Sequence, residues 1–138
     1  MHTVYTNDCS NLTAISLHGF FVGWQNPPSP EKLLELLQQS DYRILAKDAE
    51  KVIGFITAIS DGVLSAYIPF LEVLPEYQGK GVGTELASQM LNQLKKYYMI
   101  DLLCDEDIQP FYKTLGMSKA TGMMLRNYSN QSGKENHS

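Results

Sequence analysis

The chain has 138 residues, of which 43% are hydrophobic and 19% charged, and its formal net charge at pH 7 is −4. A chain of this length predicts one domain that needs no metal or disulfide to support its core, because it can bury about two-thirds of its unfolded surface. The acidic balance argues against a nucleic-acid binder. No apolar run approaches the roughly 18 residues that cross a bilayer, so we expect no membrane partner.

In chain order, the elements expected in the first half are a strand at 2–6, a helix at 11–21, a helix at 31–39, and strands at 42–47 and 51–60. Ser29 followed by Pro30 is typical of a helix start, because Ser caps the first free amides and Pro fits the first helical position. The last two strands are three residues apart, which predicts a hairpin.

The elements expected in the second half are a strand at 65–74, a helix from a glycine-rich turn to about residue 97, a strand at 98–104, a short helix at 107–115, and a strand at 117–127. Pro69 cannot donate a ladder hydrogen bond, so its strand must bulge or lose a neighbour there. A strand, turn, helix and strand form a βαβ unit, which predicts an α/β or α+β sheet with a parallel pair. We expect one domain over residues 1–128 and a disordered tail at 129–138.

The two cysteines, Cys9 and Cys104, are too few for a disulfide framework, and neither stands in a Cys/His cluster. We therefore expect no metal site. The N-terminal residues show no basic start followed by an apolar stretch, so no secretory signal is predicted. A cytoplasmic protein is the simplest expectation.

Three glycines, Gly79, Gly81 and Gly83, lie between an expected strand and an expected helix. Such a turn exposes backbone N–H groups at the positive end of the helix dipole, which suits a phosphate. The spacing fits neither the P-loop pattern GxxxxGK[ST] nor the dinucleotide pattern GxGxxG. The glycine cluster by itself is as consistent with a structural turn as with a phosphate site.

The string Gln78-Gly-Lys-Gly-Val-Gly83, after a strand that ends in Val-Leu-Pro, resembles the acyl-CoA binding motif of the GNAT superfamily of N-acetyltransferases. The string IQPFYKTLGM at 108–117 resembles a second motif of that family, with Met117 at the position where Phe is usual. The resemblance covers residues 42–125. It implies a mixed, mostly antiparallel central sheet, flanked by helices and splayed between two parallel strands.

The resemblance also implies a binding mode for acetyl-CoA as cosubstrate, with no metal. The pantetheine arm would pair with the main chain of the strand before the turn, and the pyrophosphate would lie on the amides of the turn. The residues implied in binding are Leu71, Val73, Gln78, Gly79, Lys80, Gly81, Val82, Gly83 and Thr84. For Lys80, a solvated loop lysine is an equally good interpretation.

The family transfers the acetyl group directly from thioester to amine. Tyr112 matches the family's proton-donating tyrosine, and a phenol with a pKa near 10 stays protonated at pH 7. Glu72 is a candidate base for the amine, although strand alternation leaves open whether it faces the opening between the strands. Asp101 and Asp105 are the alternatives.

The sequence therefore predicts an acetyl-CoA-dependent N-acetyltransferase that acts on a primary amine of a small molecule or peptide. The alternatives are a non-catalytic acyl-CoA sensor of the same fold and a nucleotide-binding regulator that uses the glycine turn. Because family members are often dimers, a homodimer is one expectation. The acidic run at 105–107 either caps the following helix or attracts a cationic amine.

Overall fold

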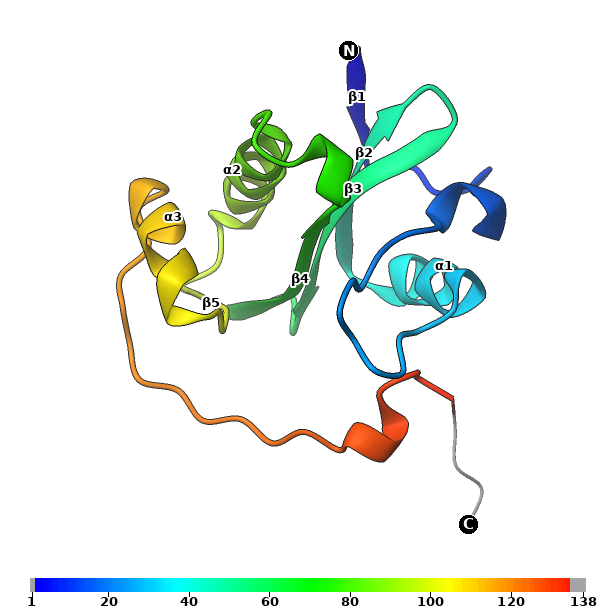
Figure 1. Ribbon diagram of the computed structural model, residues 1–138. Helices are drawn as coiled ribbons and strands as arrows, with labels where there is room; N and C mark the ends of the chain where they lie inside the picture. The colour runs from blue at the N-terminus through cyan, green and yellow to red at the C-terminus, as the bar shows by residue number, and fades with distance from the viewer. Residues whose placement is uncertain (1, 135–138) are drawn as a thin grey trace.

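The structure is a computed structural model that describes residues 2–134 (Figure 1). Its centre is one sheet with the strand order β1-β2-β3-β4-β5. The strands are β1 (Thr3–Thr6), β2 (Tyr42–Asp48), β3 (Lys51–Ser60), β4 (Ser65–Val73) and β5 (Met99–Asp101). The first four strands pair antiparallel and β5 pairs parallel to β4. This confirms the mixed, mostly antiparallel sheet predicted from the sequence.

The helices are α1 (Pro30–Gln39), α2 (Val82–Leu94) and α3 (Gln109–Thr114), with short 3-10 turns η1 (Ala14–Leu17), η2 (Pro75–Tyr77), η3 (Glu106–Ile108) and η4 (Tyr128–Asn130). Figure 1 shows α1 and α2 on opposite sides of the sheet. Leu33 and Leu37 of α1 enter one hydrophobic core, and Leu86 and Met90 of α2 enter the other. No helix among residues 2–134 is long and apolar enough to cross a membrane.

The start of α1 forms as predicted. Ser29 precedes the helix in an extended conformation, and its hydroxyl accepts a hydrogen bond from the Lys32 N–H at 3.1 Å. Pro30 occupies the first helical position, where no hydrogen-bond donor is needed.

The sheet opens between its two parallel strands. Only Ser65–Tyr67 of β4 pair with Met99–Asp101 of β5. Thr57 pairs with Phe70 and Ile59 with Tyr67, so β4 carries one more residue than β3 across this stretch, which includes Pro69. The bulge expected at the proline is therefore present, and it lies where β4 parts from β5. Beyond Tyr67, the side of β4 that faces β5 has no strand partner in the described chain.

The helix predicted over residues 11–21 is wrong, since only Ala14–Leu17 form a 3-10 turn. The following backbone has a positive φ of 97° at Gly19 and 61° at Phe21, and left-handed residues end a right-handed helix. The buried side chains of Leu17 and Phe21 hold this segment in the core that α1 covers. Tertiary burial has thus prevailed over local helix periodicity.

The strand predicted over 98–104 is shorter than expected, at Met99–Asp101, because β4 diverges and offers no further partner. The strand predicted over 117–127 is wrong for this chain, since these residues pair with no strand within the described part of it. Figure 1 shows them as an extended segment that runs from α3 to η4.

The expected boundary at residue 128 and the disorder of the tail stay predictions. Residues 135–138 of that tail lie outside the described residues. Within the described part, Tyr128–Asn130 form η4, and the Gln131 side-chain oxygen accepts a hydrogen bond from the Asn26 N–H at 2.7 Å.

Candidate active site

The free edge of β4 presents main-chain groups at two residues singled out by sequence. The Leu74 N–H donates to the Ile53 carbonyl at 2.9 Å, which makes these two a hydrogen-bonded antiparallel pair. Hydrogen-bonded pairs alternate along the ladder, so Glu72 turns its backbone groups toward β3. The backbone groups of Leu71 and Val73 then point away from β3, into the opening beside β5. Pairing of pantetheine with them stays a prediction.

Gln78 already uses one of these groups. Its side-chain Nε2 donates to the Val73 carbonyl at 3.0 Å, which ties the glycine turn to the end of β4. The sequence resemblance implied a role for Gln78 in cofactor binding without indicating this contact. Gln78 thus contacts the strand edge directly.

The glycine turn leaves a set of free amides at the start of α2. Gly79 and Gly81 have φ values of 76° and 86°, which favour glycine because other side chains are strained there. The first helical hydrogen bond runs from the Glu85 N–H to the Gly81 carbonyl at 3.1 Å. The N–H groups of residues 82–84 therefore have no hydrogen-bond partner within the described chain. They lie at the positive end of a 13-residue helix, which suits an anion.

The space above this turn is open. A Cβ atom built on Gly79 or on Gly81 would meet no heavy atom within 4 Å, and one on Gly83 would only touch Val73 at 3.7 Å. Glycine is therefore required here by backbone conformation rather than by crowding within the chain. A ligand could approach the amides closely.

Lys80 is exposed at the turn, and its Nζ lies 5.6 Å from the centroid of the Tyr77 ring. The Tyr77 hydroxyl donates to the Asp48 carboxylate at 2.9 Å, so the ring is fixed. Lys80 is thus held near the turn through a cation–π contact, with its charge outside the set of free amides.

Tyr112 lies on α3 and is half-buried. Burial, with a smaller contribution from nearby Cys104, raises the pKa of its hydroxyl to about 12. The hydroxyl therefore keeps its proton throughout the physiological range and can donate a hydrogen bond. Its ring contacts Phe111 edge-on, with the centroids 4.9 Å apart.

Cys104 follows β5 and is half-buried beside the same tyrosine. Burial, Asp105 and Asp107 raise the pKa of its thiol, which disfavours the thiolate. A nucleophilic cysteine needs the opposite shift. Among residues 2–134, no group of three His, Cys, Asp or Glu side chains could hold a metal ion.

Glu72 points to the α1 face of the sheet. Its side-chain Oε1 accepts a hydrogen bond from the Phe21 N–H at 3.1 Å. Burial raises the pKa of this carboxyl, and the hydrogen bond from Phe21 partly opposes that rise. The side chains of Leu71 and Val73, on the other face, pack against the α2 core. Glu72 therefore fixes the loop before α1 to β4, a contact between residues 51 apart that no local pattern could indicate.

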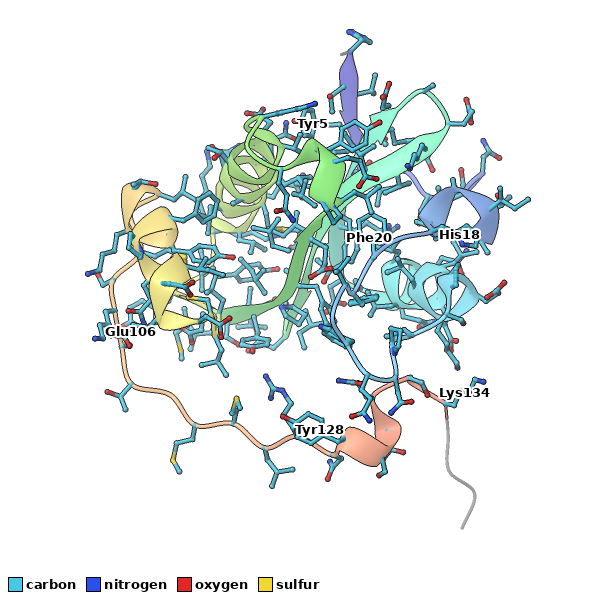
Figure 2. The ribbon with its side chains drawn as sticks, in the orientation of Figure 1. Tyr5, His18, Phe20, Glu106, Tyr128 and Lys134 are labelled. Carbon is cyan, nitrogen blue, oxygen red and sulfur yellow. The ribbon has the colours of Figure 1, made fainter. Side chains whose placement is uncertain are left out.

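An aromatic cluster surrounds the Glu72–Phe21 contact. Phe21 lies 4.7 Å from Trp24 and 5.9 Å from Phe70, measured between ring centroids. Phe20, labelled in Figure 2, packs edge-on against Phe55 at 5.0 Å. Trp24 stays partly exposed at the rim of the cluster. The loop at 19–24 thus forms an apolar wall next to Glu72.

Not every predicted site residue joins this arrangement. Asp101 and Asp105 are exposed, on β5 and just after it, and Asp105 precedes η3 without a side-chain capping bond. Within residues 2–134, no hydrogen bond joins Tyr112 to Glu72. Two surface hollows, of about 330 and 470 Å³, are lined by other residues. Neither hollow is lined by Leu71, Val73 or Tyr112, and the candidate site lies at the open edge of β4.

Comparison with known proteins finds relatives of this chain. The model of the acetyltransferase (GNAT) family matches residues 9–117. An uncharacterized N-acetyltransferase, ycf52, of Pyropia yezoensis is 34% identical over 84% of this chain and 71% of its own length. A crystal structure assigned as an acetyltransferase from Deinococcus radiodurans R1 has a TM-score of 0.93 and 42% identity, over 97% of this chain and 94% of that one. An acetyltransferase of the GNAT family from Streptococcus pneumoniae TIGR4 has a TM-score of 0.71 and 30% identity, over 91% of this chain and 97% of that one.

Proposed function

Because the chain belongs to the GNAT family of acetyltransferases, we propose that it moves an acetyl group from acetyl-CoA directly to a primary amine of a small molecule or peptide. One observation carries the proposal. The outward main-chain edge of β4 at Leu71 and Val73, where Gln78 occupies only the Val73 carbonyl, lies next to the free amides of residues 82–84, since a Cβ atom on Gly83 would touch the Val73 side chain at 3.7 Å. An extended amide chain that ends in a pyrophosphate matches both parts of this surface.

Coenzyme A would bind as an added strand followed by an anion. The pantetheine amides would hydrogen-bond to the outward groups of Leu71 and Val73, with the Val73 carbonyl released by Gln78 or shared with it. The pyrophosphate would lie on the amides of residues 79–84, where Lys80 adds a positive charge.

The acetyl carbonyl would then lie near the end of β4. When the amine attacks, negative charge develops on the carbonyl oxygen, and the outward Val73 N–H is the donor that can stabilise it. The Tyr112 hydroxyl would donate to the departing sulfur. A phenol with a pKa of about 12 is a weaker acid than a thiol near 8.5, so Tyr112 acts by hydrogen bonding as charge grows.

Glu72 is the proposed base for the amine. An alkylammonium has a pKa near 10.4 and must lose a proton before it attacks. Glu72 is half-buried on β4, next to the aromatic loop, and its raised pKa makes its carboxylate a stronger base than an exposed one. It would act directly or through a water molecule, with exposed Asp101 and Asp105 as the alternatives.

The test is a panel of primary amines incubated with acetyl-CoA, with thiol release followed by absorbance and acetylated amine by mass spectrometry. We expect at least one amine to give equal amounts of thiol and acetylated product. Coenzyme A binding without turnover of any amine would favour an acyl-CoA sensor. Displacement of coenzyme A by ATP in a thermal-shift assay would favour a nucleotide regulator.

A further inference from the structure

A hollow of about 470 Å³ opens between the loop after Trp24 and the C-terminal segment, and is hereafter the polar hollow. Its lining comes from residues 25–29 and residues 129–134. The Gln131 side-chain oxygen accepts a hydrogen bond from the Asn26 N–H at 2.7 Å, which joins the two parts across 105 positions. Figure 1 shows these parts side by side below α1. The C-terminal part lies beyond the residues 9–117 that match the family model, so that model does not describe this hollow.

The lining of the polar hollow is rich in hydrogen-bond donors and carries a positive charge. Its polar members are Gln25, Asn26, Ser29, Ser129, Ser132 and Lys134. No carboxylate lines it, although the whole chain has a net charge of −4. Side-chain amides, hydroxyls and an ammonium can all donate hydrogen bonds, and those from an ammonium to a carboxylate are the stronger ones. The lining therefore suits a carboxylate better than a second ammonium.

Lys134 is the charged member of this lining, and it is exposed. Within residues 2–134, no carboxylate lies within ion-pair distance of its Nζ. Figure 2 labels Lys134 at the end of the C-terminal segment, beneath α1. A cation without an internal partner at the rim of a donor-rich hollow is available to an anionic ligand.

The polar hollow begins close to the proposed base. The Phe21 N–H donates to the Glu72 carboxylate, and the Trp24 N–H donates to the Phe21 carbonyl at 3.2 Å, which closes a turn over residues 21–24. Gln25 of the hollow follows this turn directly. Four residues span at most about 14 Å, so the hollow starts within that distance of the Phe21–Glu72 contact. One small ligand can therefore reach both.

The surface between Glu72 and the polar hollow is apolar. Phe70 stands two residues before Glu72 on β4, so its side chain is on the same face of the sheet, about 7 Å away. The Trp24 ring lies 6.5 Å from the Phe70 ring, measured between centroids, and is partly exposed. The order along this face is thus a carboxylate, an aromatic wall and a cationic, donor-rich hollow.

We propose that the acceptor is a small molecule with a primary amine at one end and a carboxylate at the other, and that the polar hollow binds this carboxylate. The inference rests on the proposed acetyl transfer, because it names the acceptor class for that site. The amine lies at Glu72, the body of the molecule packs against Trp24, and the carboxylate meets Lys134 and the neighbouring donors. Since the two ends are bound at fixed points, the length between them is selected as well as the charge.

The first test compares acceptors that differ only in the charge of the far end. Amino acids with a terminal amine, from γ-aminobutyrate to aminooctanoate, are each paired with their own primary amide, and acetylated product is measured by mass spectrometry. At the best length we expect kcat/KM to be about fivefold higher for the acid than for the amide, mainly through KM, as an exposed ion pair allows. Equal turnover of acids and amides at every length overturns this inference and leaves the acetyl transfer standing.

A substitution of Lys134 tests the polar hollow itself. Lys134→Gln should bring the ratio of acid to amide close to one, because the cation is lost. Lys119→Gln is the matched control, since it removes the same charge from an exposed lysine of the C-terminal segment outside the hollow, and it should keep the ratio. An equal loss of the preference in both variants would trace it to net charge and overturn the proposal.

A binding measurement separates failure of this inference from failure of the proposed function. Nuclear magnetic resonance of the full chain with coenzyme A follows the backbone amides as aminooctanoate or its amide is added. We expect the acid, and not the amide, to shift the resonances of Gln25, Asn26 and Ser132. Such shifts without turnover of any amine would support the carboxylate site and contradict the acetyl transfer. An acid that shifts neither residues 25–29 nor residues 129–134 overturns the site, even if it is acetylated.

Discussion

The two sides of β4 are built in different ways. On the side of the opening, Leu71, Val73 and the glycine turn lie within fourteen consecutive residues, and strand, turn and helix fix their geometry locally. On the α1 face, Glu72 contacts Phe21 across 51 positions of sequence, inside an aromatic cluster drawn from three separate segments. A local motif thus suits a cofactor shared by a whole family, whereas long-range packing can shape an individual acceptor site.

Tyr112 belongs to neither side of β4, and loss of its hydroxyl should have the largest effect on turnover. Tyr112→Phe keeps the ring and its contact with Phe111 while removing the hydroxyl. If the hydroxyl stabilises the departing sulfur only in the transition state, turnover falls by about 10²–10⁴-fold and acetyl-CoA affinity changes little. Steady-state kinetics with an accepted amine, beside calorimetry of acetyl-CoA binding, measure both. Full activity would remove Tyr112 from the mechanism, and a joint loss of binding would make it a cofactor-pocket residue.

On the side of β4 that faces the opening, coenzyme A binding should be lost altogether when the glycine turn is altered. Coenzyme A at a hundred times its dissociation constant should stabilise the native chain by about 2.7 kcal/mol. Gly81→Val should abolish this gain, because valine is strained at a φ of 86° and its side chain would block the free amides.

The matched control for the glycine turn is Gly62→Val. Gly62 has a φ of 77° and equally open space, but it lies in the turn between β3 and β4. This variant should lose intrinsic stability to a similar degree and keep the whole coenzyme A shift in thermal denaturation. An unchanged shift in Gly81→Val would exclude the turn as the phosphate site.

A substitution in the aromatic cluster on the α1 face should affect use of the amine without affecting the binding of acetyl-CoA. Trp24 contacts Phe21 and Phe70 and is partly exposed, so it is the member of the cluster that an acceptor can touch. Trp24→Ala should raise the KM for the amine by up to about tenfold, the equivalent of one aromatic contact, at unchanged affinity for acetyl-CoA. If the KM for the amine and the affinity for acetyl-CoA changed together, the two sides of β4 would not be independent.

The smallest expected effect is on the pH dependence of stability. The pKa of Glu72 is raised in the folded chain, so the folded state holds this proton more tightly than the unfolded state does. The free energy of unfolding then falls as pH rises from the ordinary carboxyl pKa through the raised one. Glu72→Gln should remove that slope, measured by denaturant unfolding across this range. An identical slope in the variant would mean that Glu72 titrates normally.

Local signals predicted much of this molecule. The Ser29-Pro30 helix start, the hairpin and the Pro69 bulge follow from residue chemistry at single positions. The helix at 11–21 was mispredicted because burial of Leu17 and Phe21 overrode periodicity. The strand at 117–127 was mispredicted for the isolated chain because a strand needs a partner that sequence does not identify. The Glu72–Phe21 contact and the proximity of Cys104 to Tyr112 depend on tertiary structure alone.

The central claim is that the cofactor occupies the β4 edge and glycine turn while the aromatic loop serves the acceptor. Amide hydrogen exchange of the full chain, with and without coenzyme A, tests it most directly. We predict slower exchange at Leu71, Val73 and residues 82–84, with residues 19–24 unchanged. Protection of residues 19–24 instead, or no change along β4 and the turn at saturating coenzyme A, would contradict the account.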